Sequence, residues 1–336
     1  MTRRLSQIGK ALLFVAVAAF MVSESMAAEL PGKGTTVRPI KGTSASSWFQ
    51  HIVVQIGLER LGYEVAEHEI TKFPALHLAL GNGDVDYTAH HWNPLHNAFY
   101  EKSGGDSKMT RLGHLITGAL QGYLVDKATA EKHGITNIDQ MKDPEIAKLF
   151  DTDGDGKANL AGCDPGWGCE RVIEHHLDAY KLRDSINHDQ GSYFAIIADT
   201  VARQKKGEPI FYYTWTPLWL GNVIVPGKDS VWLNVPFSSL PDNRDADTTM
   251  PDGKNSGFEV NEIIIVANNA FLAENPAAKR FFELVEIPIA DVNAQNLRQH
   301  NGEKTPEDLQ RHAEEWIAAN KTKFDSWIAE AVKAAM

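Results

Sequence analysis

Between residues 46 and 61, apolar side chains recur every three or four positions, at Trp48, Phe49, Ile52, Val53 and Ile56. Serines precede this run and Gly62 follows it, which are typical start and stop signals of a helix. The spacing therefore predicts an amphipathic helix over 46–61.

Further apolar runs predict an alternation of strands and helices. After a short strand near Val37, strands are expected at 63–70, 85–90, 210–214 and 262–267. Helices are expected at 74–80, 169–180, 192–205, from Asn275-Pro276 onward, and through most of the last sixty residues. Residues 81–83, 151–168 and 251–256 are predicted to be turns and loops. This alternation is typical of an α/β architecture with a mostly parallel sheet.

The N-terminus has the pattern of a secretory signal peptide. Basic residues at Arg3, Arg4 and Lys10 precede an apolar run over 11–22, and the small-residue pattern Ser-Met-Ala ends at Ala27. The apolar run is too short to span a bilayer as a helix, and no later stretch is long and apolar enough. We therefore expect cleavage near Ala27/Ala28 and an exported protein without membrane insertion.

Charge narrows the classes of partner. The full chain has a formal net charge of -11, which becomes about -13 when residues 1–27 are removed. An acidic surface argues against nucleic acid and anionic membranes as partners. It does not identify a ligand.

The mature chain is long enough for two domains. We expect one α/β domain to be interrupted by a second, with chain crossings near 118–122 and 255–262. The predicted lobes are 28–120 together with 259–336, and 121–258.

The only two cysteines, Cys163 and Cys169, lie in "CDPGWGC". Because an oxidising compartment favours disulfides, they are expected to pair; two free thiols or a metal site are the alternatives. So short a loop contributes little chain entropy to stability, so the bond is better explained by rigid placement of Trp167.

An exported metal-dependent hydrolase is one functional hypothesis. The sequence has no Gly-x-Ser-x-Gly elbow, His-Glu-x-x-His pair or phosphate-binding glycine loop. Metal ligands could be sought among His90, His91 and His96, or at His175 and His176. Adjacent residues of a strand point to opposite faces, however, which favours packing or surface roles for these histidines.

Asp151, Asp153, Asp155 and Gly156 reproduce the first half of a calcium-binding loop. Position twelve of such a loop is a bidentate glutamate, and here it is Gly162. Two interpretations therefore stay open: a plain turn rich in aspartate and glycine, or a loop that a bound ion braces. No metal is assigned.

Three of the eight tryptophans, Trp92, Trp167 and Trp215, lie in loop-like sequences, whereas Trp48, Trp316 and Trp327 follow core patterns. Trp92 and Trp215 directly follow predicted strands, beyond which ligands bind in open α/β sheets. Three rings around one cleft would form an aromatic cage for a methylated cation. Packing of loops by these rings is the structural alternative.

Gly168 and Cys169 open the helix predicted after Trp167, so their N–H groups are first-turn donors suited to an anion. His96 could supply another donor. A cage for a methylated cation beside donors for a carboxylate describes a site for a betaine.

Long segments of the chain also resemble one known family. They include "AELPGKG", "WNPLH", "LFDTDGDGKANLAGCDPGWGCE", "FYYTWTP", "VPFSSLPD" and "NPAAKRFFELV". From end to end the mature chain resembles the periplasmic glycine betaine/proline betaine-binding proteins of osmoprotectant ABC importers.

The resemblance implies a two-lobed, type II-like periplasmic binding fold that closes on its ligand. It implies that Trp92, Trp167 and Trp215 box the trimethylammonium group and that His96, Gly168 and Cys169 hold the carboxylate. It also implies the Cys163–Cys169 disulfide, a membrane permease as partner, a monomer, no cofactor and no catalysis. A receptor for choline or carnitine is the alternative within the same class.

Overall fold

A computed structural model describes residues 29–241 and 243–336. The predicted signal peptide lies outside the described residues. Among these residues, no helix has the length and apolarity needed to cross a membrane.

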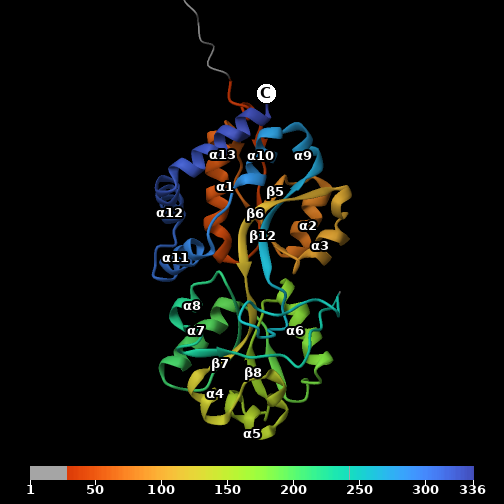
Figure 1. Cartoon of the computed structure of the whole chain (residues 1–336), viewed down its shortest axis with the longest axis vertical. Coiled ribbons are helices and arrows are strands. Elements are labelled where there is room, and N and C mark those ends of the chain that lie inside the picture. Colours follow the sequence, from red (N-terminus) through yellow and green to blue (C-terminus); the bar gives the residue numbers. More distant parts are fainter. Residues whose placement is uncertain (1–28, 242) are drawn as a thin grey trace, which may run out of the picture.

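Figure 1 shows two groups of elements, one above the other, joined by two stretches of chain. The first connection runs from β6 into β7 and the second leads into β12. The two-lobed α/β fold expected from the sequence is therefore present.

The upper group is built on a three-stranded sheet in the order β5-β12-β6, with strands β5 (Tyr87–Asn93), β12 (Asn261–Asn268) and β6 (Met109–Ala119). β12 is antiparallel to both neighbours. The prediction of a mostly parallel sheet is wrong here. The chain leaves this group along β6 and returns along β12, so these paired strands run in opposite directions.

Four short strands form two parallel pairs beside this sheet. β1 (Thr36–Val37) pairs with β3 (Glu64–Val65), and β2 (Ile40–Lys41) pairs with β4 (Glu69–Ile70). The single strand predicted over 63–70 is therefore two strands, because its halves bind different partners.

Helices cover the upper sheet (Figure 1). They are α1 (Trp48–Arg60), α2 (Phe73–Asn82), α3 (Asn97–Lys102), α9 (Asn269–Glu274), α10 (Pro276–Leu284), α11 (Ile289–His300), α12 (Pro306–Ala319) and α13 (Lys321–Ala334), with 3-10 turns at Ala45–Ser47 and Gly105–Ser107.

The ends of these helices follow from local sequence. α1 and α10 begin close to their predicted positions, and α12 begins at a capping box in which the side chains of Thr305 and Asp308 accept each other's backbone N–H. α2 extends two residues beyond the predicted 74–80 and ends at Gly83, whose φ of 80° is one that glycine adopts without strain.

The lower group contains a five-stranded mixed sheet. Its order is β11 (Ser230–Trp232), β7 (Gln121–Asp126), β10 (Phe211–Trp215), β8 (Ala158–Ala161) and β9 (Ile186–Asp189). β7 is antiparallel to β10 and β11, whereas β8 is parallel to β10 and β9. β8 falls inside the loop predicted over 151–168; its four residues are all buried, so no polar alternation marks it.

Helices also flank the lower sheet: α4 (Lys127–His133), α5 (Pro144–Ala147), α6 (Gly168–Ala179), α7 (Tyr193–Lys205) and α8 (Leu220–Val223), with 3-10 turns at Ile138–Lys142 and Lys148–Phe150. α6 and α7 match the helices predicted at 169–180 and 192–205 to within one residue. α6 begins at Gly168, and this start positions the site described next.

Candidate functional site

A cavity of about 330 Å³, part of it open to solvent, lies where the two groups of elements meet. Its wall contains all six residues that the sequence analysis singled out for ligand binding: Trp92, His96, Trp167, Gly168, Cys169 and Trp215. The remaining lining residues are Ser44, Ser46, Phe73, His90, Leu95, Gln121 and Tyr213.

The three tryptophans come from three different elements. Trp92 lies in β5, Trp215 is the last residue of β10, and Trp167 immediately precedes α6. Trp92 thus lies near the end of its strand rather than after it, because β5 extends to Asn93 beyond the predicted end at His90. All three open into the cavity although each is only 5–7% exposed.

The aromatic wall on the α6 side is held by ring contacts. The ring centroids of Trp167 and Trp215 are 5.6 Å apart, with the planes at 77°. Tyr193 packs behind both, at 6.1 Å from Trp167 and 4.5 Å from Trp215. The Tyr193 hydroxyl donates to the Tyr213 carbonyl over 3.1 Å, so the wall is tied to β10.

The loop before α6 carries Trp167 between the two cysteines. The expected disulfide between Cys163 and Cys169 is present. Gly166 has a φ of 89° and donates its N–H to Glu170 Oε2 over 2.7 Å. The Trp167 indole N–H donates to Thr43 Oγ1 over 2.9 Å, which connects this loop to the segment before α1.

The N-terminus of α6 faces the opposite wall at close range. A Cβ at Gly168 would lie 2.7 Å from Leu95 Cγ and 3.0 Å from His96 Cδ2, so any larger residue would have to displace these side chains. Trp167 makes no side-chain capping bond to the first turn. The N–H groups of Gly168 and Cys169 therefore remain suited to an anion in the cavity.

His96 is held in one tautomer. The Trp92 backbone N–H donates to His96 Nδ1 over 3.2 Å, so the neutral ring carries its proton on Nε2. Burial lowers the pKa of His96 well below its usual 6.5, and the neighbouring His91 and His77 add to this effect. His96 is thus a neutral donor at physiological pH.

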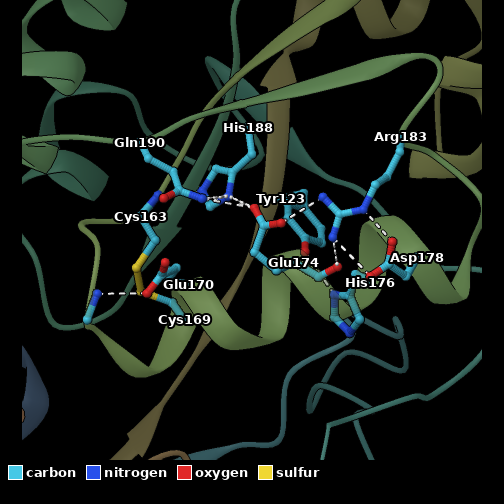
Figure 2. Close-up of polar contacts among 11 residues, drawn as sticks. Tyr123, Cys163, Cys169, Glu170, Glu174, His176, Asp178, Arg183, His188 and Gln190 are labelled. Carbon is cyan, nitrogen blue, oxygen red and sulfur yellow. Dashed lines mark hydrogen bonds and ion pairs between the residues drawn. A yellow bond between two sulfur atoms is a disulfide. The ribbon is translucent and has the colours of Figure 1, made fainter. Parts of the chain in front are cut away.

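Behind the disulfide loop, Figure 2 shows polar contacts among His188, Glu174 and Arg183, and the Arg183 side chain is exposed. The Cys163 N–H donates to His188 Nε2 over 3.0 Å, and His188 Nδ1 donates to Glu174 Oε1 over 2.7 Å. Arg183 donates to the second Glu174 oxygen over 2.7 Å and also pairs with Asp178. Although burial acts to raise the pKa of Glu174, the bonds from His188 and Arg183 lower it.

The structure groups the histidines differently from the sequence-based hypothesis. Ring nitrogens of His77, His91 and His96 lie within 4.8 Å of one another, and His90 is not part of this group. His77 Nδ1 lies 2.8 Å from the Phe73 carbonyl and its Nε2 lies 2.9 Å from His91 Nδ1, so both nitrogens are already hydrogen-bonded. With the Trp92 N–H donating to His96 Nδ1, each of the three histidines makes a hydrogen bond within the protein.

The other candidate groups have structural partners. His176 contacts the Tyr123 hydroxyl and the Ser239 carbonyl at 2.8 and 2.9 Å, and His175 contacts Ser239 Oγ at 2.8 Å. In the aspartate loop, Asp151 accepts the N–H groups of Gly154 and Gly156 at 2.6 and 2.9 Å. These bonds account for the turn and lower the pKa of Asp151.

Several lining residues were missed from the sequence. Tyr213 could have been found, because alternation along Phe211–Trp215 places it on the same face as Trp215. Phe73 and Gln121 carry no such signal, since their positions depend on how the two groups of elements meet.

Comparisons with known proteins identify the family of the chain. Residues 35–319 match the family described as the substrate binding domain of ABC-type glycine betaine transport systems. The chain is 49% identical to the glycine betaine/proline betaine-binding periplasmic protein of Escherichia coli over 96% of this chain and 98% of that protein. It is 50% identical to the glycine betaine-binding periplasmic protein of Dickeya dadantii, over 91% of this chain and 93% of that protein.

A solved structure shares the fold at low sequence identity. Lactococcal OpuAC in its closed conformation with glycine betaine has a TM-score of 0.66 at 21% identity, covering 88% of this chain and 99% of that one. With the family match spanning most of the sequence, the chain belongs to the substrate-binding domains of ABC-type glycine betaine transport systems.

Proposed function

We propose that this protein captures glycine betaine or proline betaine in the cavity between its lobes and delivers it to the membrane permease of an ABC importer. The observation that carries the proposal is that Trp92, Trp167 and Trp215 line the same cavity as the first-turn N–H groups of α6. The protein then acts in the periplasm as a monomeric binding protein without catalysis or a cofactor.

The cation end of the ligand contacts the indole faces. A quaternary ammonium has no N–H to donate, so a carboxylate partner offers it no hydrogen bond, whereas a ring face offers its negative quadrupole. Each such contact contributes ~0.5–2 kcal/mol. Three of them, with the buried methyl groups, are sufficient for a micromolar dissociation constant, about -8 kcal/mol.

The carboxylate end contacts the donors on the facing side. The N–H groups of Gly168 and Cys169 and the Nε2 proton of His96 supply these donors, and His96 is neutral before the ligand enters. Choline has no carboxylate and would leave them without an anionic partner. The site therefore favours betaines over choline.

We further propose that residues 28–120 with 259–336 form one lobe, that 121–258 form the other, and that the lobes close around the ligand. The hydrogen bond from Trp167 to Thr43 then runs from lobe to lobe. Because a ligand that contacts both lobes binds the closed form better, it shifts the population toward that form, which the permease recognises.

Calorimetric titration with glycine betaine tests the proposal. We expect a micromolar dissociation constant and weaker binding of choline in a parallel titration. The absence of both heat and a thermal shift at millimolar glycine betaine would contradict the proposed function, and tighter binding of choline would contradict the proposed ligand.

A further inference from the structure

Gln121 lies at the junction of the two lobes and has no role in the site described so far. It is the first residue of β7, and its side chain is 1% exposed. It pairs with Trp215 across β7 and β10. Side chains of directly paired residues lie on the same face of a sheet, so Gln121 faces the cavity that Trp215 closes.

The amide of Gln121 is oriented by Tyr213. The Tyr213 hydroxyl donates to Gln121 Oε1 over 2.7 Å. This bond turns the Nε2 group away from the phenol. Gln121 Nε2 is buried and has no hydrogen-bond acceptor among residues 29–241 and 243–336.

A buried N–H donor without an acceptor is rare in folded proteins, because its lost hydration is not replaced. Gln121 lines both the cavity that contains the three tryptophans and a second, neighbouring cavity. Leu95 and Gly168 also line both cavities. The Gln121 side chain therefore lines the same cavity as the start of α6, where the anionic end of the ligand is expected.

We propose that Gln121 Nε2 donates a hydrogen bond to the anionic end of the bound ligand, directly or through one ordered water. Gln121 is thus a specificity-determining residue, and this role rests on the proposed function. A quaternary ammonium carries no lone pair, so the donor serves only the carboxylate. The residue also follows the crossing from β6, so its bond links the ligand to the connection between the lobes.

The competing explanation is that Gln121 serves only to hold Tyr213. The substitution Gln121→Glu separates the two roles. Glutamate has the same shape and keeps an oxygen that accepts the Tyr213 hydroxyl, but it replaces the free donor with an anion.

The experiment titrates glycine betaine into the wild type, Gln121→Glu and Gln121→Leu at pH 8 and at pH 9.5, because burial raises the pKa of the introduced glutamate and the higher pH ionises it. We expect the dissociation constant to rise at least tenfold for Gln121→Glu and about three- to thirtyfold for Gln121→Leu. Gln50→Leu is the matched control, because Gln50 is equally buried but lines neither cavity. Its dissociation constant should stay within twofold of the wild type.

Ligand-free melting curves verify that each variant is folded. If Gln121→Glu does not fold, the titration of Gln121→Leu tests the inference instead. Wild-type affinity in Gln121→Glu at pH 9.5, or in Gln121→Leu where it alone folds, would overturn the inference while the proposed function stands. A wild-type protein that does not bind glycine betaine would overturn both.

Discussion

Trp215 closes the cavity from the end of β10, and its ring is held from behind by Tyr193 and beside Trp167. This support explains how an indole that is only 5% exposed can still face open space. The ring is fixed before the ligand arrives, which lowers the ordering cost of binding.

Replacing Trp215 with alanine should raise the dissociation constant for glycine betaine more than tenfold, because one cation–π contact and its buried area are lost. Calorimetry measures the change, and circular dichroism verifies the fold. Trp327→Leu is the control, since Trp327 is buried in α13, away from the cavity. Unchanged affinity in Trp215→Ala would remove this residue from the proposed cage.

The Trp167 indole N–H donates a hydrogen bond to Thr43 Oγ1, and this bond can be removed by a single substitution. Thr43→Val keeps the shape of the side chain and removes the acceptor. We expect a two- to tenfold rise in the dissociation constant for glycine betaine, since a net hydrogen bond contributes about 0.5–1.5 kcal/mol. Equal affinity of variant and wild type would show that this bond does not favour the closed form.

At the scale of elements, the disulfide loop and α6 form one unit that presents Trp167 and the first-turn donors together. The bond from Cys163 N–H to His188 fixes the beginning of this unit from behind. The disulfide fixes its end. In the proposed function, this one short segment therefore contacts both ends of the zwitterion.

Replacing Cys163 and Cys169 together with serine should weaken glycine betaine binding more than it lowers the melting temperature. The backbone N–H of residue 169 is retained, so the loss reports on the rigidity of the loop rather than on a missing donor. Titration of the preparation gives the dissociation constant, and thermal unfolding of the same preparation gives the melting temperature. A large fall in melting temperature with unchanged affinity would show that the bond serves stability instead.

Local elements were largely predictable from the sequence. α1, α6, α7 and β10 lie close to their predicted positions because helical spacing, glycine stops and aromatic runs are local signals. The direction of the strands and the short buried strand β8 could not be predicted, because they depend on partner strands distant in the sequence. The six expected ligand residues meet in one cavity, whereas the position of Gln121 depends on the packing of the lobes.

At the scale of the whole molecule, many histidines are buried in neutral form. Burial lowers the pKa of His68 and His77 to about 4 and of His90 and His176 to about 3. The pKa values of His51, His91 and His96 are also lowered well below 6.5 by burial. In the unfolded chain each of these groups binds a proton near pH 6.5.

Stability should therefore fall on acidification. Between pH 6.5 and about 4 the unfolded state binds more protons than the native state, so the free energy of unfolding decreases as the pH falls. Each histidine contributes up to about 1.4 kcal/mol per pH unit in this window. Carboxylates with lowered pKa values, such as Glu174, act in the same direction but only below their usual 4.5.

Denaturant midpoints of the ligand-free protein at pH 7.5, 6.0 and 5.0 measure this dependence, and we expect a fall at each step. In His176→Gln, which can keep contacts to Tyr123 and Ser239, the fall should be smaller because one titrating group is gone. Equal midpoints at pH 7.5 and 5.0 would mean that these histidines accept protons within the native fold. The neutral state assigned to His96 as a donor to the ligand would then be wrong as well.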